Sequence, residues 1–162
     1  MIVKEAIRMK LSSTAFTQNG HIPSKYTCDG DNVSPPLKIE FIPALAKSLV
    51  LIMDDPDIPD YVKAKLHLEK FDHWVTFNIS TNTKEIPEDT KLGQQGRNSA
   101  GRNEYTGPCP PDREHRYFFK LYAIDTKLQL MPGASKAEVD AAMKGHVVDH
   151  CELVGLYERG KK

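Results

Sequence analysis

The feature that most restricts the fold of this chain is a short apolar run at residues 48–53, with the sequence Ser-Leu-Val-Leu-Ile-Met. Six residues are too few for a helix of ordinary length, and an Asp- and Pro-rich loop follows at once, at residues 54–59. A short apolar run bounded by turn residues is typical of a buried strand. The sequence therefore predicts a buried strand over residues 48–53 that leads directly into this loop.

Five other segments show strand patterns. Residues 7–12 and 37–41 alternate apolar and polar side chains, residues 74–79 and 117–124 are rich in aromatic and β-branched side chains, and residues 153–157 form a last strand segment. The connections between these segments are long and contain glycine and proline. The pattern predicts a mainly β fold, a β-sandwich with a few helices at its periphery.

One helix is clear from the sequence. Ser135-Lys136-Ala137-Glu138 fits a capping box, in which Ser135 caps the helix and Glu138 reaches back to the cap amide. This helix should end near Gly145. Residues 60–70 are a weaker helix candidate, and the alternative is an exposed, charged insertion.

Charge and length limit the classes of partner. The 162 residues carry 22 basic and 22 acidic side chains, and this zero net charge argues against a nucleic-acid or anionic-membrane binder. The length predicts a single domain over residues 1–162, and a monomer or a homodimer is expected. No apolar run approaches the roughly 20 residues that span a bilayer, and the N-terminus lacks the apolar core of a secretory signal. The expected location is therefore the cytoplasm, without integral membrane association.

The three cysteines and one pair of histidines are the candidate cross-links and metal ligands of the sequence. Cys28, Cys109 and Cys151 give an odd count without CxxC spacing, which indicates neither a disulfide framework nor a zinc site. One disulfide beside one free thiol stays open. His146 and His150 have the spacing of a helical zinc pair, but the helix should end at Gly145, before both of them. No metal and no cofactor is therefore expected.

Two proline-rich loops hold side chains that bind or carry protons. Residues 55–59 read Asp-Pro-Asp-Ile-Pro, and residues 107–117 read Gly-Pro-Cys-Pro-Pro-Asp-Arg-Glu-His-Arg-Tyr. Proline fixes φ and has no N–H, so it holds neighbouring polar groups in a rigid arrangement. Asp55 and Asp57 could instead be turn residues that satisfy local amides, and the Ile58–Pro59 bond is a candidate for the cis form.

Histidines stand at the heads of two predicted strands. Each of His73 and His115 alone is more often a structural residue, but two of them beside a rigid Asp loop favour a binding site. Tyr117 falls on the same strand face as His115. Cys109 supplies the only backbone N–H in the run of residues 108–111, which suits a small oxyanion such as a phosphate monoester or a carboxylate.

Several of these segments resemble motifs of the phosphatidylethanolamine-binding protein family. They occur in the same order along the chain as in the family and at plausible spacings. They are TCDGDNVSPPL at residues 27–37, DPDIP at 55–59, HWVTFNI at 73–79, the stretch 107–125 and the closing CELVGLY at 151–157. The resemblance covers nearly the whole chain and is strongest to the compact bacterial and archaeal members. It implies a β-sandwich with a small anion pocket near one end, lined by Asp55, Asp57, His73, Cys109, Pro111, His115 and Tyr117.

What the resemblance implies about function is binding. Members of the family bind phosphoryl head groups or phosphopeptide-like anions, are described as kinase modulators or serine protease inhibitors, and are not generally regarded as enzymes. In this chain His73, the Cys109 amide, His115 and Tyr117 are expected to contact the anion. Asp55 and Asp57 are expected to orient the site, and Pro59 and Pro111 to stiffen its walls.

The chain departs from the family pattern in three places. Phe71-Asp72 precedes His73, where the family commonly has tryptophan or another histidine. The charged insertion at residues 60–70 follows the Asp loop. The interval from Pro111 to His115 is short and charged, and we expect it to narrow the pocket.

Two other functions stay open. A hydrolase or transferase would use Cys109 as a nucleophile beside His115, or an Asp55–histidine acid–base pair, although the chain has no GxSxG elbow. A protease inhibitor could instead act through an exposed loop, either residues 60–70 or residues 97–104, without using the pocket. No catalytic residue is assigned, and binding is the expected function.

Overall fold

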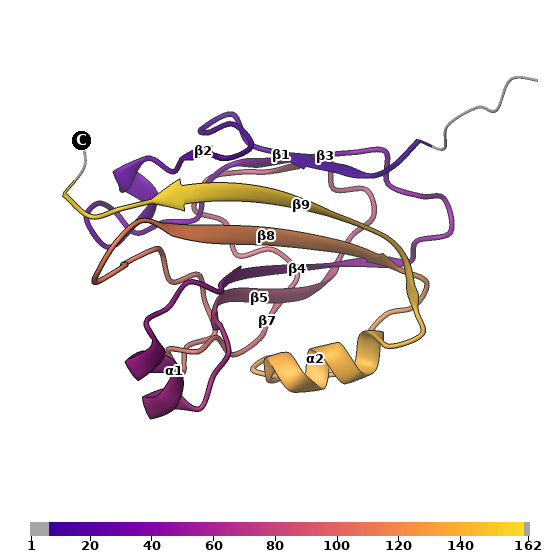
Figure 1. Ribbon diagram of the computed structural model, residues 1–162. Coiled ribbons are helices and arrows are strands. Elements are labelled where there is room, and N and C mark those ends of the chain that lie inside the picture. The colour runs from indigo at the N-terminus through magenta and orange to yellow at the C-terminus, as the bar shows by residue number, and fades with distance from the viewer. Residues whose placement is uncertain (1–6, 161–162) are drawn as a thin grey trace, which may run out of the picture.

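The computed structural model describes residues 7–160, which form two packed β-sheets flanked by two α-helices (Figure 1). The smaller sheet has the order β1-β3-β6, and its strands are β1 (Lys10–Ser12), β3 (Leu37–Glu40) and β6 (Glu85–Ile86). The larger sheet has the order β2-β9-β8-β4-β5-β7, and its strands are β2 (Gly20–His21), β4 (Ser48–Asp55), β5 (Phe71–Ile79), β7 (Gln94–Gln95), β8 (His115–Ile124) and β9 (Val147–Tyr157). The predicted mainly β sandwich is confirmed.

All six predicted strands are present, with shifted ends. The apolar run became β4, which lies between β5 and β8 and is buried at every position. It runs two residues beyond the predicted end, to Asp55. β3 ends one residue early, at Glu40, where Phe41 follows with a φ of 61°, outside the regular strand conformation. The two-residue strands β2, β6 and β7 were not predicted, because such short segments carry no periodicity.

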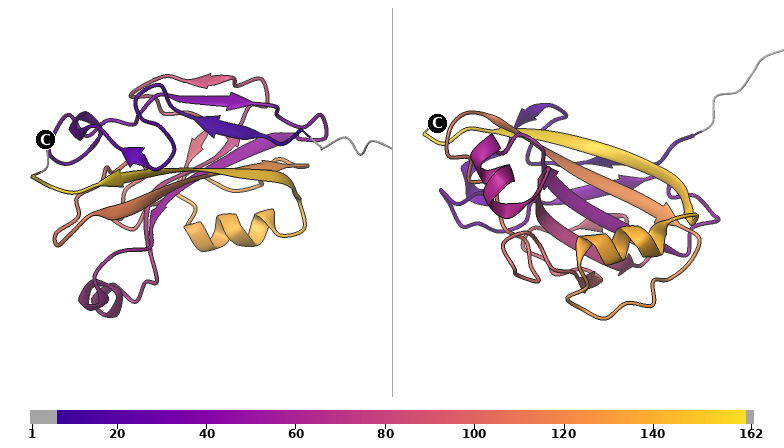
Figure 2. Two further views of the ribbon diagram at one scale, coloured as in Figure 1. Left: turned by 45° about the horizontal axis from the view of Figure 1, so that its top comes forward. Right: turned by 60° about the horizontal axis from the view of Figure 1, so that its bottom comes forward.

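Both faces of β4 are covered, which explains its continuous apolar sequence. Leu49, Leu51 and Met53 face the core between the two sheets. Val50 and Ile52 face the other side, where α2 (Lys136–Met143) covers the larger sheet (Figure 2). In a strand that is buried on both faces, each apolar side chain that leaves water stabilises the fold. Such a strand therefore does not alternate apolar and polar residues.

The helix α2 has the predicted capping box. The Ser135 hydroxyl accepts a hydrogen bond from the Glu138 N–H at 3.1 Å, and the Glu138 carboxylate accepts one from the Ser135 N–H at 3.2 Å. The helix ends at Met143, and Gly145 follows with a φ of 83°. His146 therefore lies outside the helix and His150 lies within β9, so the two do not share a helix face.

The charged segment at residues 60–70 is both a helix and an exposed insertion, the two forms that were predicted as alternatives. It contains a short helix, α1 (Asp60–Leu66), and none of the seven side chains of this helix is buried. The helix projects from the end of the larger sheet (Figure 2). The suggestion of a cis Ile58–Pro59 bond is wrong: residues 7–160 contain no cis peptide bond, and Pro59 precedes α1 in an extended conformation.

A disulfide joins Cys28 to Cys109 across 81 residues of sequence, with 5.5 Å between the two Cα atoms. It ties the loop before β3 to the proline-rich loop before β8. Cys151 is free and half-buried, and burial raises the pKa of its thiol to about 12. The possibility of one disulfide beside one free thiol is therefore the one observed. Within residues 7–160, no helix has the length and apolar character needed to cross a membrane.

Replacing Ser135 with alanine should lower the free energy of unfolding by about 1 kcal/mol, because the Glu138 N–H loses its partner at the helix end. Urea denaturation measures this difference. Ser135→Asp is the matched control, since aspartate also caps helices and should keep most of the stability. Equal losses in both variants would contradict a capping role.

Removing the disulfide with Cys28→Ser and Cys109→Ser should cost about 4 kcal/mol, because the unfolded chain regains the entropy of a long open loop. The comparison is made by denaturation of the oxidised wild type and the double variant. Cys151→Ser, which removes the free thiol, should change stability far less. Reduced wild type should match the double variant, and an unchanged midpoint on reduction would count against this expectation.

Candidate functional site

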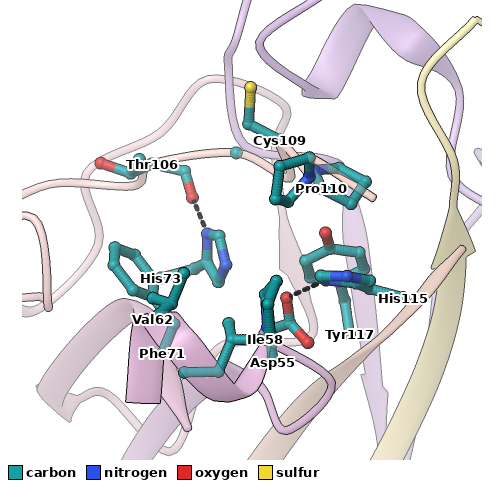
Figure 3. A pocket seen from close by; sticks show the side chains of 13 residues that line it. Asp55, Ile58, Val62, Phe71, His73, Thr106, Cys109, Pro110, His115 and Tyr117 are labelled. Carbon is teal, nitrogen blue, oxygen red and sulfur yellow. Dashed lines mark hydrogen bonds and ion pairs between the residues drawn. The ribbon is translucent and has the colours of Figure 1, made fainter. Parts of the chain in front are cut away.

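A cavity of about 240 Å³ opens at the end of the sandwich where β4 ends and where β5 and β8 begin (Figure 3). Antiparallel pairing brings these three strand ends together, because Asp55 pairs with Phe71 and Asp54 pairs with Phe118. A bulge lies here, since Met53 and Asp54 oppose the three residues from Asp72 to Trp74. The remaining wall comes from the Asp loop, from α1 and from the proline-rich loop before β8. The lining residues are Asp55, Ile58, Pro59, Val62, Phe71, His73, Thr106, Gly107, Cys109, Pro110, Pro111, His115 and Tyr117.

Six of the seven pocket residues expected from the sequence line this cavity, and Asp57 does not. The Asp57 carboxylate accepts two hydrogen bonds from the Arg116 guanidinium and one from the Arg116 N–H, all at 2.9 Å. The bonds from the Arg116 side chain hold the pKa of Asp57 below its usual value. Asp57 still helps to orient the site through its backbone, because its N–H donates to Asp55 Oδ1 at 2.7 Å.

His115 lies between two carboxylates. Its Nδ1 is 2.7 Å from Asp55 Oδ2 and its Nε2 is 2.6 Å from Asp112 Oδ1. Burial alone lowers the pKa of His115, but the hydrogen bonds and charges of Asp55 and Asp112 outweigh burial and raise it above the usual value. Ionised carboxylates only accept hydrogen bonds, so both ring nitrogens donate. His115 is therefore an imidazolium whose two N–H groups are both in use.

His73 is in a different state. Its Nδ1 lies 2.7 Å from the Thr106 carbonyl oxygen, which can only accept, so Nδ1 carries a proton. Burial lowers the pKa of His73, which makes the ring neutral near pH 7. The Nε2 atom makes no hydrogen bond within residues 7–160 and lies on the ring edge toward the cavity (Figure 3). The neutral ring therefore offers a lone pair to the cavity, and a protonated ring would offer an N–H.

The Tyr117 hydroxyl is buried without any hydrogen-bond partner in the described part of the chain. The side chain is fully buried, and burial raises the pKa of the phenol, so the hydroxyl keeps its proton. A buried polar atom without a partner costs roughly 1–3 kcal/mol. In Figure 3 the hydroxyl points from the ring toward Pro110, another residue of the cavity wall. Tyr117 therefore presents an unused donor to whatever occupies the cavity.

Cys109 lines the cavity as half of a disulfide. The Cys109 sulfur is bonded to that of Cys28, so it is not available as the thiolate nucleophile of the hydrolase or transferase hypothesis. Its backbone N–H donates to no group within residues 7–160. The expected contact between this amide and an anion stays a prediction.

Two contributions to the site were missed from the sequence. The hydrogen bond that His115 makes with Asp112 was not predicted, although the charged interval was expected to narrow the pocket. The available signal was that the two residues lie three positions apart in the sequence. The apolar wall residues Ile58, Val62 and Phe71 were also missed. They come from the Asp loop, from α1 and from β5, and they line one cavity only in the folded chain. Phe71 packs on the His73 ring, with 4.8 Å between the ring centroids.

Comparisons with known proteins agree with this architecture. The family model described as phosphatidylethanolamine-binding protein matches residues 12–158. A UPF0098 protein of Methanothermobacter thermautotrophicus is 51% identical over 159 residues, which cover 94% of this chain and 100% of that protein. A UPF0098 protein of Pyrococcus horikoshii is 48% identical over 96% of this chain and 79% of its own length.

Solved structures show the same fold. The phosphatidylethanolamine-binding protein homologue CT736 of Chlamydia trachomatis superimposes with a TM-score of 0.89 at 41% identity, covering 94% of this chain and 98% of that one. YbcL of E. coli, described as a member of the mammalian PEBP family, gives a TM-score of 0.82 at 27% identity, covering 94% and 99%. The family resemblance seen in the sequence motifs is thus confirmed over almost all of the chain, and this chain belongs to the phosphatidylethanolamine-binding protein family.

Proposed function

We propose that this chain is a binding protein that takes one small phosphorylated or carboxylated group into the cavity beside His73 and Tyr117, and that it acts through binding and not through catalysis. The observation that carries this proposal is a pair of polar atoms of residues lining one cavity, Tyr117 Oη and His73 Nε2, that have no hydrogen-bond partner among residues 7–160. A volume of about 240 Å³ suits a single head group, since sites for drug-sized molecules start at about 300 Å³.

The physical chemistry of the walls supports an anionic ligand. The Tyr117 hydroxyl can donate to an anionic oxygen, and a proton on His73 Nε2 would add a second, charge-assisted hydrogen bond. The surrounding wall is apolar, with Ile58 and Phe71 on one side and Pro110 on the other. Hydrogen bonds in such a poorly solvated place are stronger than in water.

The competing enzyme function finds less support. Cys109 is held in a disulfide, which removes the candidate nucleophile. In the Asp55–His115 pair, a general base needs a free ring nitrogen, but Nε2 of His115 already donates to Asp112. Neither Cys109 nor His115 is therefore placed to attack or deprotonate a bound molecule. His73, whose neutral ring keeps a free Nε2 lone pair, is the one histidine of this alternative that could still act as a base.

The proposal extends to a partner protein, such as a serine protease or a kinase, whose activity the chain would modulate. The exposed helix α1 adjoins the cavity through Val62, so a partner that contacts α1 would also sense the ligand. Inhibition through a surface loop is the rival route and does not need the cavity. The single domain, the cytoplasmic location and the monomeric or dimeric state expected from the sequence stay predictions.

Substituting His73→Ala and His115→Ala together should abolish the binding of phosphoethanolamine measured by calorimetric titration, because the site loses both imidazoles. The matched control is His146→Ala with His150→Ala. Both histidines are exposed, and they lie at the end of the sandwich opposite the cavity, where β8 ends and β9 begins. The same samples enter an inhibition assay with a chymotrypsin-like protease. Inhibition that survives in a pocket variant without binding would point to the surface loops, and no binding by the wild type would refute the proposed pocket function.

Anion affinity should fall as the pH rises from about 5.5 to 8, by up to about tenfold per unit, because His73 is neutral in the free site and must take up a proton to donate. Inorganic sulfate is the suitable probe, since its own charge is constant over this range. His73→Gln should flatten the dependence, because glutamine donates without titrating. A flat profile in the wild type would count against a charged His73 contact.

A further inference from the structure

Both N–H groups of His115 are already used by carboxylates of the protein itself, so this imidazolium has nothing left to offer an incoming anion. The two carboxylates are held very differently. The Asp55 side chain is 3% exposed, and its second oxygen accepts the Asp57 N–H at 2.7 Å. The Asp112 side chain is 36% exposed, and its second oxygen lies 3.7 Å from the Arg113 guanidinium. The backbone N–H groups of Asp112 and Arg113 also interact with this carboxylate. Asp55 is therefore a fixed partner of His115, whereas Asp112 is one that can leave.

Charge balance limits what can join this cluster. Asp55 and Asp112 each contribute one negative charge and His115 one positive charge, so these three side chains alone carry a net charge of minus one. The Arg113 guanidinium, 3.7 Å from the Asp112 carboxylate, offsets part of it. Adding an anion beside the cluster would bring like charges together in an apolar, poorly screened cavity, which is unfavourable. Exchanging the Asp112 carboxylate for the incoming anion removes one negative charge from the cluster and so lowers this repulsion.

The neighbouring groups are arranged for such an exchange. The rings of His115 and Tyr117 are stacked, with 6.3 Å between their centroids, and the Tyr117 hydroxyl has no partner in the described part of the chain. A phosphate group has several acceptor oxygens and can therefore accept more than one hydrogen bond at once. Asp112 gives His115 a single bond and leaves Tyr117 unsatisfied.

We propose that Asp112 is an internal competitor, a carboxylate that holds the anion position on His115 in the free protein and leaves it when an external anion binds. This inference rests on the proposed anion-binding function and adds a regulating residue to it. A tethered competitor acts at a high effective concentration, of the order of millimolar or above. It therefore weakens the binding of every anion that contacts His115 by the same factor, and anions with low intrinsic affinity remain unbound.

The test is the Asp112→Asn variant, titrated calorimetrically at pH 6 with phosphoethanolamine and, separately, with inorganic sulfate. Losing the competing charge-assisted bond should tighten binding of both anions by about tenfold or more. The matched control is Asp60→Asn, which removes the same charge from an exposed position at the start of α1 without touching His115. Its affinity should stay within about twofold of the wild type, as expected for a screened surface charge. Circular dichroism melting checks that both variants fold, and Asp112→Ala repeats the test without the amide.

The outcomes separate the two proposals. If the wild type binds and Asp112→Asn and Asp112→Ala bind no more tightly, the competitor is refuted while the anion-binding function stands. A gain of equal size in Asp60→Asn would also refute it, because the effect would then be general electrostatics. If neither the wild type nor any Asp112 variant binds either anion, both proposals fall. Binding that is detected only in the Asp112 variants would refute both the anion-binding function of the wild type and the exchangeable competitor, because Asp112 would then block the site permanently.

Discussion

The burial of β4 on both of its faces is the constraint on which the rest of the structure depends. Leu49, Leu51 and Met53 fill the space between the sheets, and Val50 and Ile52 pack under α2. This arrangement sets the register of the strand, because a slip by one residue would exchange the two faces. The same alternation continues into the polar end of the strand, so Asp55 follows Met53 on the inner side and enters the cavity. The position of the site is thus a consequence of how the core is packed.

A carboxylate delivered into a buried place needs partners, and the site is organised around this need. An unpaired buried charge costs several kcal/mol, whereas a paired and hydrogen-bonded one is tolerated. Asp55 has the Asp57 N–H and His115, and Asp54, on the other face, meets the Lys120 ammonium at 2.9 Å. His115 becomes charged because of Asp55 and can then hold Asp112 as well. The two histidines thereby differ in charge state, His115 being cationic and His73 neutral.

Much of the fold could be predicted because its signals are local. The alternation of apolar side chains, the capping box at Ser135 and the proline-rich loops act within a few residues of sequence. The disulfide could not be assigned, because three cysteines allow several pairings and only the meeting of two distant loops selects Cys28 and Cys109. Asp57 was expected in the pocket with Asp55, since they lie two apart in one loop. The chain turns away after β4, so Asp57 meets Arg116 instead.

Sequence alone determined the mainly β architecture, the family and the identity of most cavity-lining polar residues, because these depend on residue type and on order along the chain. Tertiary structure decided how each of those residues is used. Within residues 7–160, it left the Tyr117 hydroxyl and His73 Nε2 without a hydrogen-bond partner, and it engaged both nitrogens of His115 with Asp55 and Asp112. The physical reason is that a side chain's charge and free hydrogen-bonding capacity depend on burial and on neighbours from other strands, and no local pattern in the sequence encodes those neighbours.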